Sequence, residues 1–209
     1  MGLAFQRRVL AAVLPVCERY GMALAGAAAL RAHGIGCPPG DGLEFAGGPP
    51  AVVDELAVAL WEAGLEVSVE GGRLIAVDPA EGLRCPVEAG DGAPLEPPVR
   101  RDGLPVVTLD DAVGLRVRDL HERGLARDVA DLAAVAQLYS FRELERLGGR
   151  LLPGFSLQEL GMRLGFAGGV GGEDGPARRF AAAWLEDLAL RRAEDGDADY
   201  DHPDLPVLD

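Results

Sequence analysis

Hydrophobic positions along the first half of the chain predict helices and strands in turn. Apolar residues recur at helical spacing in 4–19 and 49–64, so each of these segments is predicted to be a helix. Pro15 falls inside the first one and is expected to kink it or to start a new helix. Three later segments have the alternation of short strands, and the first two are predicted to form a hairpin: 65–70, 73–78 and 83–87.

A strand, a glycine turn and a short helix are predicted between those two helices. Residues 22–25 form an apolar strand, Gly26 follows at a tight turn, and an alanine-rich helix runs to His33. A second strand, 43–45, carries the acid Glu44. Because Gly26 has no Cβ, another part of the chain or a ligand can approach it closely. Backbone N–H groups at such a turn favour anions such as phosphate.

The second half of the chain is predicted to be mainly helical. A Pro/Gly-rich connection, 89–105, leads to a short strand at 105–109, and Thr108 or Asp110 can cap the helix that follows. The glycine-rich segment 166–175 lacks the spacing of a nucleotide-binding loop, so we predict a flexible linker there. Helical segments are predicted within 109–135 and at 140–147, 156–164 and 176–192, the second and third opened by Ser-x-x-Glu capping boxes.

Composition narrows the classes of function. All twenty basic residues are Arg, and the absence of Lys excludes Schiff-base and P-loop lysine chemistry. The net charge of −14 argues against an extended nucleic-acid surface, although a local Arg patch can bind phosphate. Cys17, Cys37 and Cys85 are widely spaced and are predicted to be reduced thiols. With no membrane-length apolar run and no secretory signal, a cytoplasmic location is expected, and the Arg/Ala/Gly/Pro-rich usage favours a GC-rich bacterial genome.

The stretch LAGAAALRAHGIGCPPGDGLEF resembles the opening motif of the AbiEii/AbiGii-type nucleotidyltransferases, within the polymerase-beta-like nucleotidyltransferase superfamily. The second half of the motif departs from the family pattern, since Gly42 and Glu44 stand where the family has two metal-binding Asp residues. Asp41 is one residue out of place, Ala27 replaces a glycine, and Pro86 stands where a later strand carries the third acid. The first half of the family pattern is matched by Leu24, Ala25, Gly26, Ala29, His33 and Gly34.

A second motif resembles the family's R-x-x-x-R-D-x-x-D core. Arg123, Arg127, Asp128 and Asp131 match it, and Arg116 stands where the family has a Lys thought to face the triphosphate. The residues alone leave a second interpretation open. Arg127 and Asp131 are spaced i, i+4 on one helix and Asp128 lies in its first turn, so these side chains also suit helix stabilisation.

The resemblance implies an α/β (α+β) fold, with a nucleotidyltransferase-like mixed β-sheet flanked by helices and a C-terminal helical region. On this basis we expect a nucleotidyltransferase-like domain at 1–139, a helical region at 140–193 and an acidic flexible tail at 194–209. His33 also has a structural interpretation, in which it packs under the motif helix.

The resemblance also implies Mg²⁺ chemistry, because nucleotidyl transfer needs carboxylate-bound Mg²⁺ to hold the triphosphate. Acids at i and i+2 on a strand share a face, but Gly42-Leu43-Glu44 supplies only one carboxylate. Glu44, Asp41 and Asp128 are the predicted catalytic residues, and the predicted metal ligands are Glu44 and the substitute Glu88, two residues beyond Pro86. The predicted nucleotide or ligand contacts are Gly26, Ala27, His33, Arg116, Arg123, Arg127 and Asp131.

Three functions remain open from the sequence. The first is an active transferase that moves a nucleoside monophosphate from NTP·Mg²⁺ to an acceptor. The second is a pseudoenzyme whose old cleft binds a partner protein, as in a toxin–antitoxin pair, or a ligand. The third is a metal-independent biosynthetic enzyme for a small molecule. We predict an impaired or altered nucleotidyltransferase, since losing metal ligands removes transition-state stabilisation. Mg²⁺-dependent NTP binding separates the first function from the others.

Overall fold

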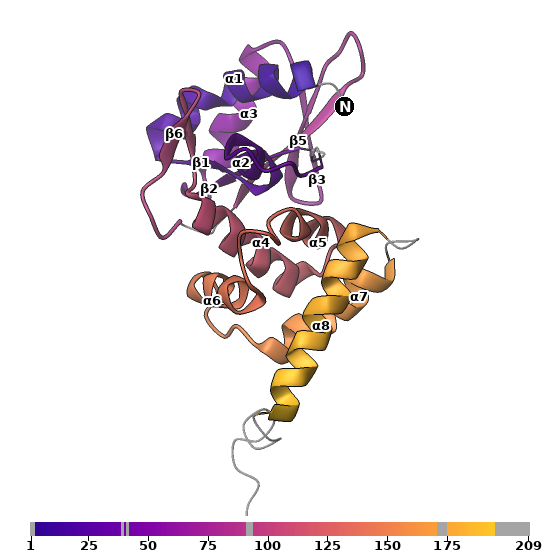
Figure 1. Cartoon of the computed structure of the whole chain (residues 1–209). Coiled ribbons are helices and arrows are strands. Elements are labelled where there is room, and N and C mark those ends of the chain that lie inside the picture. The colour runs from indigo at the N-terminus through magenta and orange to yellow at the C-terminus, as the bar shows by residue number, and fades with distance from the viewer. Residues whose placement is uncertain (1–2, 39, 41, 91–93, 171–174, 195–209) are drawn as a thin grey trace, which may run out of the picture. The chain divides into compact units, whose positions relative to one another are not determined.

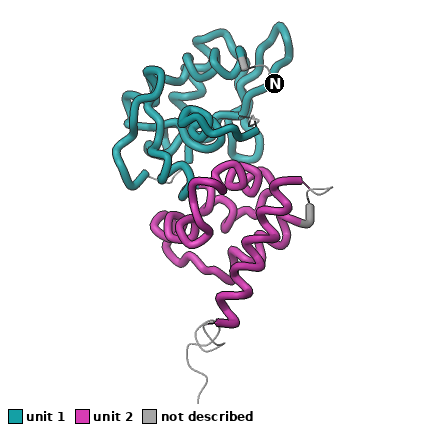
Figure 2. Tube along the Cα trace, in the orientation of Figure 1, with its two compact units in different colours: residues 1–115 teal, residues 116–209 magenta. Residues whose placement is uncertain are grey.

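The computed structural model describes residues 3–38, 40, 42–90, 94–170 and 175–194 (Figure 1). The chain forms two compact units, Met1–Leu115 and Arg116–Asp209 (Figure 2). Unit 2 begins at Arg116, within the helix Leu109–Arg123, and the next helix along the chain packs on the last two helices of this unit. The domain boundary between residues 139 and 140 stays a prediction. The predicted acidic tail lies outside the described residues from 195 onward.

Unit 1 is built on a mixed sheet of seven strands in the order β3-β4-β5-β2-β1-β7-β6. The pairs β1–β7 and β2–β5 are parallel and the other neighbouring pairs are antiparallel. The predicted hairpin is confirmed as β3 and β4. The strands are β1 Ala23–Ala25, β2 Leu43–Ala46, β3 Glu66–Glu70, β4 Arg73–Val77, β5 Arg84–Gly90, β6 Val99–Arg101 and β7 Leu104–Val106.

Helices α1 (Leu3–Tyr20) and α3 (Val52–Glu62) pack on each other, and both contact strands of the sheet. Pro15 was predicted to kink the first helix or to start a new one. No new helix starts there, because α1 runs through Pro15 as one helix. Its apolar stripe is buried both before and after Pro15, at Val9 and Cys17, so packing holds the two halves together. The third helix of unit 1 is α2, Gly26–Ala32.

The 89–105 segment was predicted to be an irregular connection, and this was wrong in part. It contains strand β6 and the hairpin turn to β7, while β5 extends to Gly90. The turn is Asp102-Gly103, with φ values of 49° and 82°. An Asp-Gly pair with two positive φ angles is the sequence signal of a two-residue hairpin, so the strands on either side could have been recognised.

Proline cannot donate to a sheet ladder and is usually confined to sheet edges or bulges, yet Pro86 lies in β5, inside the sheet between β4 and β2. Pro86 pairs in register with Ile75 on the β4 side. On the β2 side the ladder begins one residue later, at Leu43 and Val87. The missing N–H of Pro86 therefore lies beyond the end of that ladder, which is why a proline is tolerated in a central strand.

Unit 2 is helical. Its elements are α4 Leu109–Arg123, which crosses from unit 1, α5 Ala126–Ala133, α6 Phe141–Leu151, α7 Leu157–Val170 and α8 Pro176–Glu194. Thr108 caps α4 by accepting the Asp111 N–H at 3.2 Å. The predicted capping box at Ser140 and Glu143 is confirmed in full. The glycine-rich segment is helical up to Val170, so the predicted linker was wrong there, and 171–174 lie outside the described residues.

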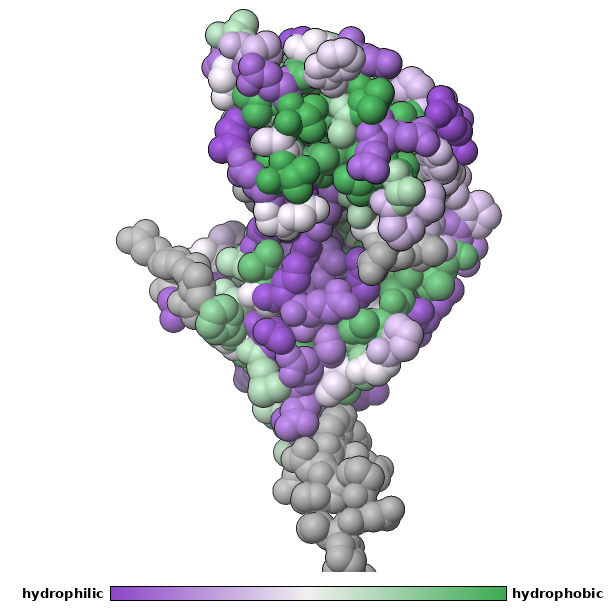
Figure 3. Space-filling view, turned by 180° about the vertical axis from the view of Figure 1, so that it is seen from behind, coloured by the Kyte–Doolittle hydropathy of each residue, from purple (hydrophilic) through white to green (hydrophobic). Residues whose placement is uncertain are grey.

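Polar and apolar side chains are mixed over the surface. On the face drawn in Figure 3, hydrophilic residues gather over the middle of unit 2, with apolar residues beside them. The most exposed large apolar side chain is Trp61 on α3, with 72% of its surface accessible. Among the described helices, none combines the length and hydrophobicity that crossing a membrane requires.

Candidate functional site

Strand register brings two carboxylates together in unit 1. Glu44 on β2 pairs with Glu88 on the parallel neighbour β5, and with Ala25 on β1. Paired residues of neighbouring strands point to the same face of a sheet, and the strands lie about 5 Å apart. The opposite face at this point carries the buried side chains of Leu43 and Val87. Glu44 and Glu88 are both half-buried, so they form a carboxylate pair on the face away from this part of the core.

Arg73, on the neighbouring strand β4, lies next to this carboxylate pair. Because Leu74 pairs with Val87, the preceding residue of β4 lies beside Glu88. The Nε atom of Arg73 is 3.1 Å from Glu88 Oε2, and both side chains keep about a third of their surface exposed. Arg73 was not among the predicted site residues. Only the register of the hairpin, which spacing along the sequence does not give, places it next to Glu88.

The position that the resemblance assigns to the first metal-binding acid is closed by backbone. A Cβ atom added to Gly42 would lie 2.3 Å from the carbonyl oxygen of Pro86 and 2.9 Å from its Cβ. Both distances are shorter than real Cβ contacts allow. Gly42 and Pro86 are thus packed against each other. A carboxylate at position 42 would require β2 and β5 to separate.

The turn after β1 has the predicted geometry. Gly26 begins α2 with φ of 62°, a left-handed angle that favours glycine, and Gly26 and Ala27 are both buried. The loop that follows α2 lies against this turn, because Cys37 Sγ is 3.4 Å from the Ala27 carbonyl oxygen. Gln6 of α1 donates to the carbonyl of Gly40 in the same loop at 3.0 Å. Asp41, a predicted catalytic residue, lies outside the described residues.

His33 joins α2 to the end of β7. Its Nε2 lies 2.8 Å from the carbonyl oxygen of Val107, which can only accept a hydrogen bond, so Nε2 carries the proton. The other ring nitrogen, Nδ1, faces Arg101 Nη2 at 3.4 Å. The guanidinium N–H of Arg101 can donate to this nitrogen. The bond to Val107 ties the C-terminal end of α2 to the residue that follows β7.

The residues of the second motif form an ionic cluster in unit 2, centred on Arg116. This side chain is 1% exposed, and its guanidinium lies 3.1 Å from Asp119, 3.2 Å from Asp128 and 2.9 Å from Asp131. Arg123, one-quarter exposed, reaches Asp119 at 2.7 Å. These ion pairs connect the end of α4 to α5 across Gly124, whose φ of 63° breaks the helix.

Asp128 is the most deeply buried acid of this cluster, with no exposed surface. Its Oδ1 lies 3.2 Å from Arg116, 3.5 Å from Arg123 and 4.0 Å from the half-exposed Arg127. Its Oδ2 has no hydrogen-bond partner among the described residues. Burial raises the pKa of Asp128 to about 6, although Arg116 and Arg123 act to lower it. Loss of solvation therefore outweighs the attraction of the arginines.

We expect this raised pKa to make Asp128 favour folding at mildly acidic pH. The ordinary Asp pKa is about 3.9, and the pKa of Asp128 in the folded chain is about 6. At pH values between these two, the Asp128 carboxyl is protonated in the folded chain and ionised in the unfolded chain. The contribution of Asp128 to the unfolding free energy should therefore increase as pH falls from about 7 to about 4, by at most about 3 kcal/mol. Urea unfolding of the parent and of Asp128→Asn across this range measures it, since the substitution should remove that pH-dependent difference. If the unfolding free energies of the two proteins change with pH by the same amount, the raised pKa does not belong to Asp128.

The structure thus groups the predicted residues by unit. Gly26, Ala27, His33, Glu44 and Glu88 lie in unit 1, and Arg116, Arg123, Arg127, Asp128 and Asp131 lie in unit 2. Within the described parts of the chain, no three or more His, Cys, Asp or Glu side chains are grouped so that they could hold a metal ion. Glu44 and Glu88 are the predicted acids that the structure sets side by side on the sheet of unit 1.

Comparison with known proteins defines the class of fold. No protein-family model and no curated protein matches the chain. Among solved structures, JHP933 from Helicobacter pylori is similar with a TM-score of 0.50 and 14% identity, over 91% of this chain and 95% of that one. Its similarity extends over both units. Together with the mixed seven-stranded sheet and the helical C-terminal region, this likeness confirms the predicted fold class, an α/β (α+β) fold with a mixed sheet flanked by helices.

Two further solved structures are similar at a lower score. A candidate nucleotidyltransferase from H. pylori has a TM-score of 0.49 and 14% identity, over 90% of this chain and 96% of that one. MenT4, a nucleotidyltransferase toxin from Mycobacterium tuberculosis, has a TM-score of 0.49 and 15% identity, over 88% of this chain and 92% of that one.

Proposed function

We propose that this protein is a nucleotidyltransferase-fold protein with an altered active site, in which the Glu44–Glu88 pair stands in for the three acids of the resembling family. The packing of Gly42 against Pro86 carries this proposal, because a side chain at position 42 would meet the Pro86 backbone and Pro86 itself supplies no carboxylate. The pairing of Glu44 with Glu88 supports it further. Two neighbouring carboxylates remain on the sheet face where the family pattern places its metal ligands.

This pair fits one Mg²⁺ ion better than two. Mg²⁺ is commonly held by one or two carboxylates, with water and substrate phosphates completing its coordination. Glu44 and Glu88 would be those ligands, and the bound ion would neutralise charge on the triphosphate. Arg73 competes for Glu88, since its Nε lies 3.1 Å from the carboxylate. The proposed reaction is transfer of a nucleoside monophosphate from an NTP, at a rate well below that of a site with three acids.

The test is calorimetric titration of the full chain with ATP, GTP, CTP and UTP, each with and without Mg²⁺. We expect Mg²⁺-dependent binding of at least one nucleotide, weakened about tenfold or more by Glu44→Gln or Glu88→Gln because each removes a charged ligand. Glu66→Gln is the matched control, since Glu66 is exposed on the edge strand β3 and should leave binding unchanged. Two bound metal ions per chain, or nucleotide binding indifferent to Glu44, would refute the proposal.

A second candidate function is a pseudoenzyme that binds a ligand or a partner protein without metal. The Arg73–Glu88 ion pair favours it, because a guanidinium already neutralises one of the two carboxylates. Arg73→Gln separates the two functions in the same titration. Removal of a competing cation should strengthen Mg²⁺ binding in an altered transferase, whereas a pseudoenzyme should bind no Mg²⁺ in either form.

The proposed location is the cytoplasm. The three cysteines are free and buried, as expected for a chain kept under reducing conditions. Burial raises the pKa of Cys17 to about 12 and that of Cys85 to about 11, so both thiols stay protonated and unreactive.

A further inference from the structure

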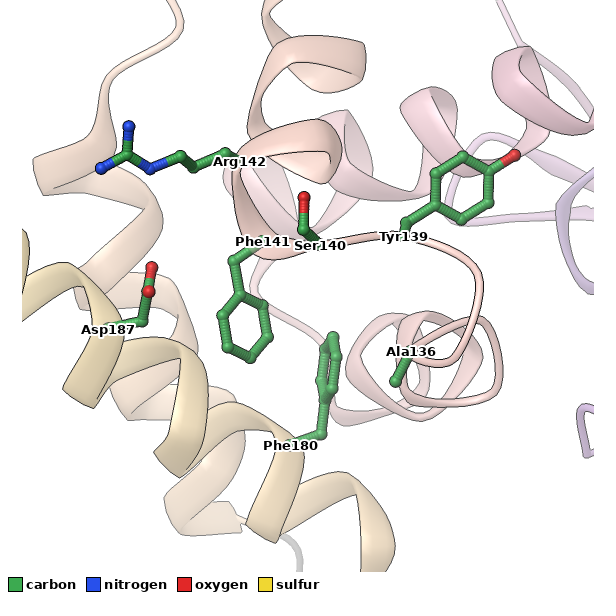
Figure 4. A pocket seen from close by; sticks show the side chains of 7 residues that line it. All are labelled: Ala136, Tyr139, Ser140, Phe141, Arg142, Phe180 and Asp187. Carbon is green, nitrogen blue, oxygen red and sulfur yellow. The ribbon is translucent and has the colours of Figure 1, made fainter.

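Unit 2 contains a cavity that the proposed transferase site does not use. It has a volume of about 310 Å³ and lies between α8, the start of α6 and the segment that follows α5. This is close to the lower limit, roughly 300 Å³, of pockets that bind small molecules. Its lining residues are Ala136, Tyr139, Ser140, Phe141, Arg142, Phe180 and Asp187 (Figure 4).

Two aromatic rings form the apolar part of the cavity. The rings of Phe141 and Phe180 have centroids 5.5 Å apart at an interplanar angle of 60°. In Figure 4 they lie next to each other, while the side chain of Tyr139 turns away from them. Ala136, beside Phe180, has only a methyl group and leaves space in front of the rings. A flat apolar group of one or two rings fits this surface, because aromatic rings prefer offset or tilted contacts with one another.

The rings of Phe141 and Phe180, which we call the aromatic wall of the cavity, are held in place by packing and hydrogen bonds. Trp184 is fully buried and stacks on Phe141 with ring centroids 5.3 Å apart. Its indole N–H donates to Glu145 at 2.9 Å, and Glu145 also accepts two hydrogen bonds from Arg191. The capping box at Ser140 fixes the backbone from which Phe141 extends. A ligand would therefore meet a preformed wall, and little side-chain freedom would be lost on binding.

The charged side chains at the cavity favour an anion. Arg142 is exposed, and it makes no ion pair or hydrogen bond within the part of the chain that the structure describes. Asp187 lies on the same side of the rings (Figure 4), but its carboxylate is already bound by Arg191 at 2.8 Å. Arg142 also stands at the start of α6, where the helix dipole is positive. Of the two charged side chains, the one without a partner is thus Arg142, and the N–H groups of its planar guanidinium match a carboxylate.

We propose that this cavity binds a small aromatic carboxylic acid, with its ring against Phe141 and Phe180 and its carboxylate on Arg142. One guanidinium balances one negative charge, so a mono-anion suits the site better than a triphosphate. The aromatic wall distinguishes such an acid from an aliphatic one. The cavity would serve as a ligand site of unit 2, built from residues other than those of the proposed transferase site.

Titration with phenylacetate and with its neutral analogue phenylacetamide tests the proposal. The reporter is the fluorescence of Trp184 in the full chain carrying Trp61→Phe, because Trp61 is 72% exposed and Trp184 is then the single indole. We expect phenylacetate to bind at least about tenfold more tightly than phenylacetamide, since only the acid forms a charge-assisted hydrogen bond. Arg142→Gln should abolish this difference and leave both compounds with the weaker affinity.

Arg146→Gln is the matched control, one turn further along α6 and equally exposed. It should leave the preference for the acid intact. Phe180→Leu should weaken the binding of phenylacetate and of phenylacetamide by the same factor, because it removes a ring contact and no charge. Equal binding of the two compounds by the parent, binding of neither, or a preference that survives Arg142→Gln would overturn the proposal.

Discussion

Arg116→Met should destabilise unit 2 by about 3–5 kcal/mol at neutral pH, the range typical when one partner of a buried charge cluster is removed. The guanidinium is 1% exposed and lies within 3.2 Å of three carboxylates. Methionine fills much of the same volume, so the loss measures charge and not packing. Without Arg116, Asp128 keeps only the longer contacts with Arg123 and Arg127, at 3.5 and 4.0 Å.

Urea unfolding at pH 7.5 and pH 5 measures this effect and its cause. Because the pKa of Asp128 is raised to about 6, its protonation at pH 5 should remove part of the unpaired charge and make the loss smaller there. Arg127→Met is the control, since this side chain is 39% exposed and 4.0 Å from Asp128, and should cost less than about 1 kcal/mol. If the two arginine variants unfold at the same urea concentration, the cluster does not depend on Arg116.

Gly42→Ala should cost about 3 kcal/mol, towards the upper end of the effects caused by overpacking. The added methyl carbon would lie 2.3 Å from the carbonyl oxygen of Pro86, and backbone in a central strand cannot turn aside as the end of a side chain can. The same reasoning predicts that Gly42→Asp does not restore a metal ligand. A carboxylate there would first have to push β2 away from β5.

The control for this prediction is Gly36→Ala, in the loop that precedes β2. Nothing lies within 4 Å of a Cβ added there, so thermal unfolding should change by less than about 0.5 kcal/mol. A Gly42→Ala variant as stable as the Gly36→Ala variant would show that the strands yield at this point. In that case the closed acid position would no longer support an altered site.

Local patterns predicted several turns and caps of both units because each depends on residues close together in the chain. The turn at Gly26, the hairpin at Gly71-Gly72 and the cap at Ser140 all have short-range causes, and all are present. The β6–β7 hairpin was missed because prolines on both sides, Pro97, Pro98 and Pro105, obscured its Asp102-Gly103 signal.

Features that depend on register could not be predicted in the same way. Spacing along β5 shows that Glu88 and Pro86 share a face, but not that Glu88 pairs with Glu44 or that Arg73 lies beside it. The contact between Gly42 and Pro86 likewise joins two strands far apart in sequence. The motif residues were predicted as ligand contacts or as helix-stabilising charges, and spacing alone did not indicate an ion-pair cluster with Arg116 buried within it.

The contact between Gly42 and Pro86 has an evolutionary consequence. Natural selection tests substitutions one at a time, and an aspartate at position 42 would meet the Pro86 backbone whatever side chain stands at position 86. That substitution is therefore harmful before a carboxylate at position 42 could bring any benefit. Sequences related to this protein should accept changes beside Glu44 and Glu88 more readily than a side chain at Gly42.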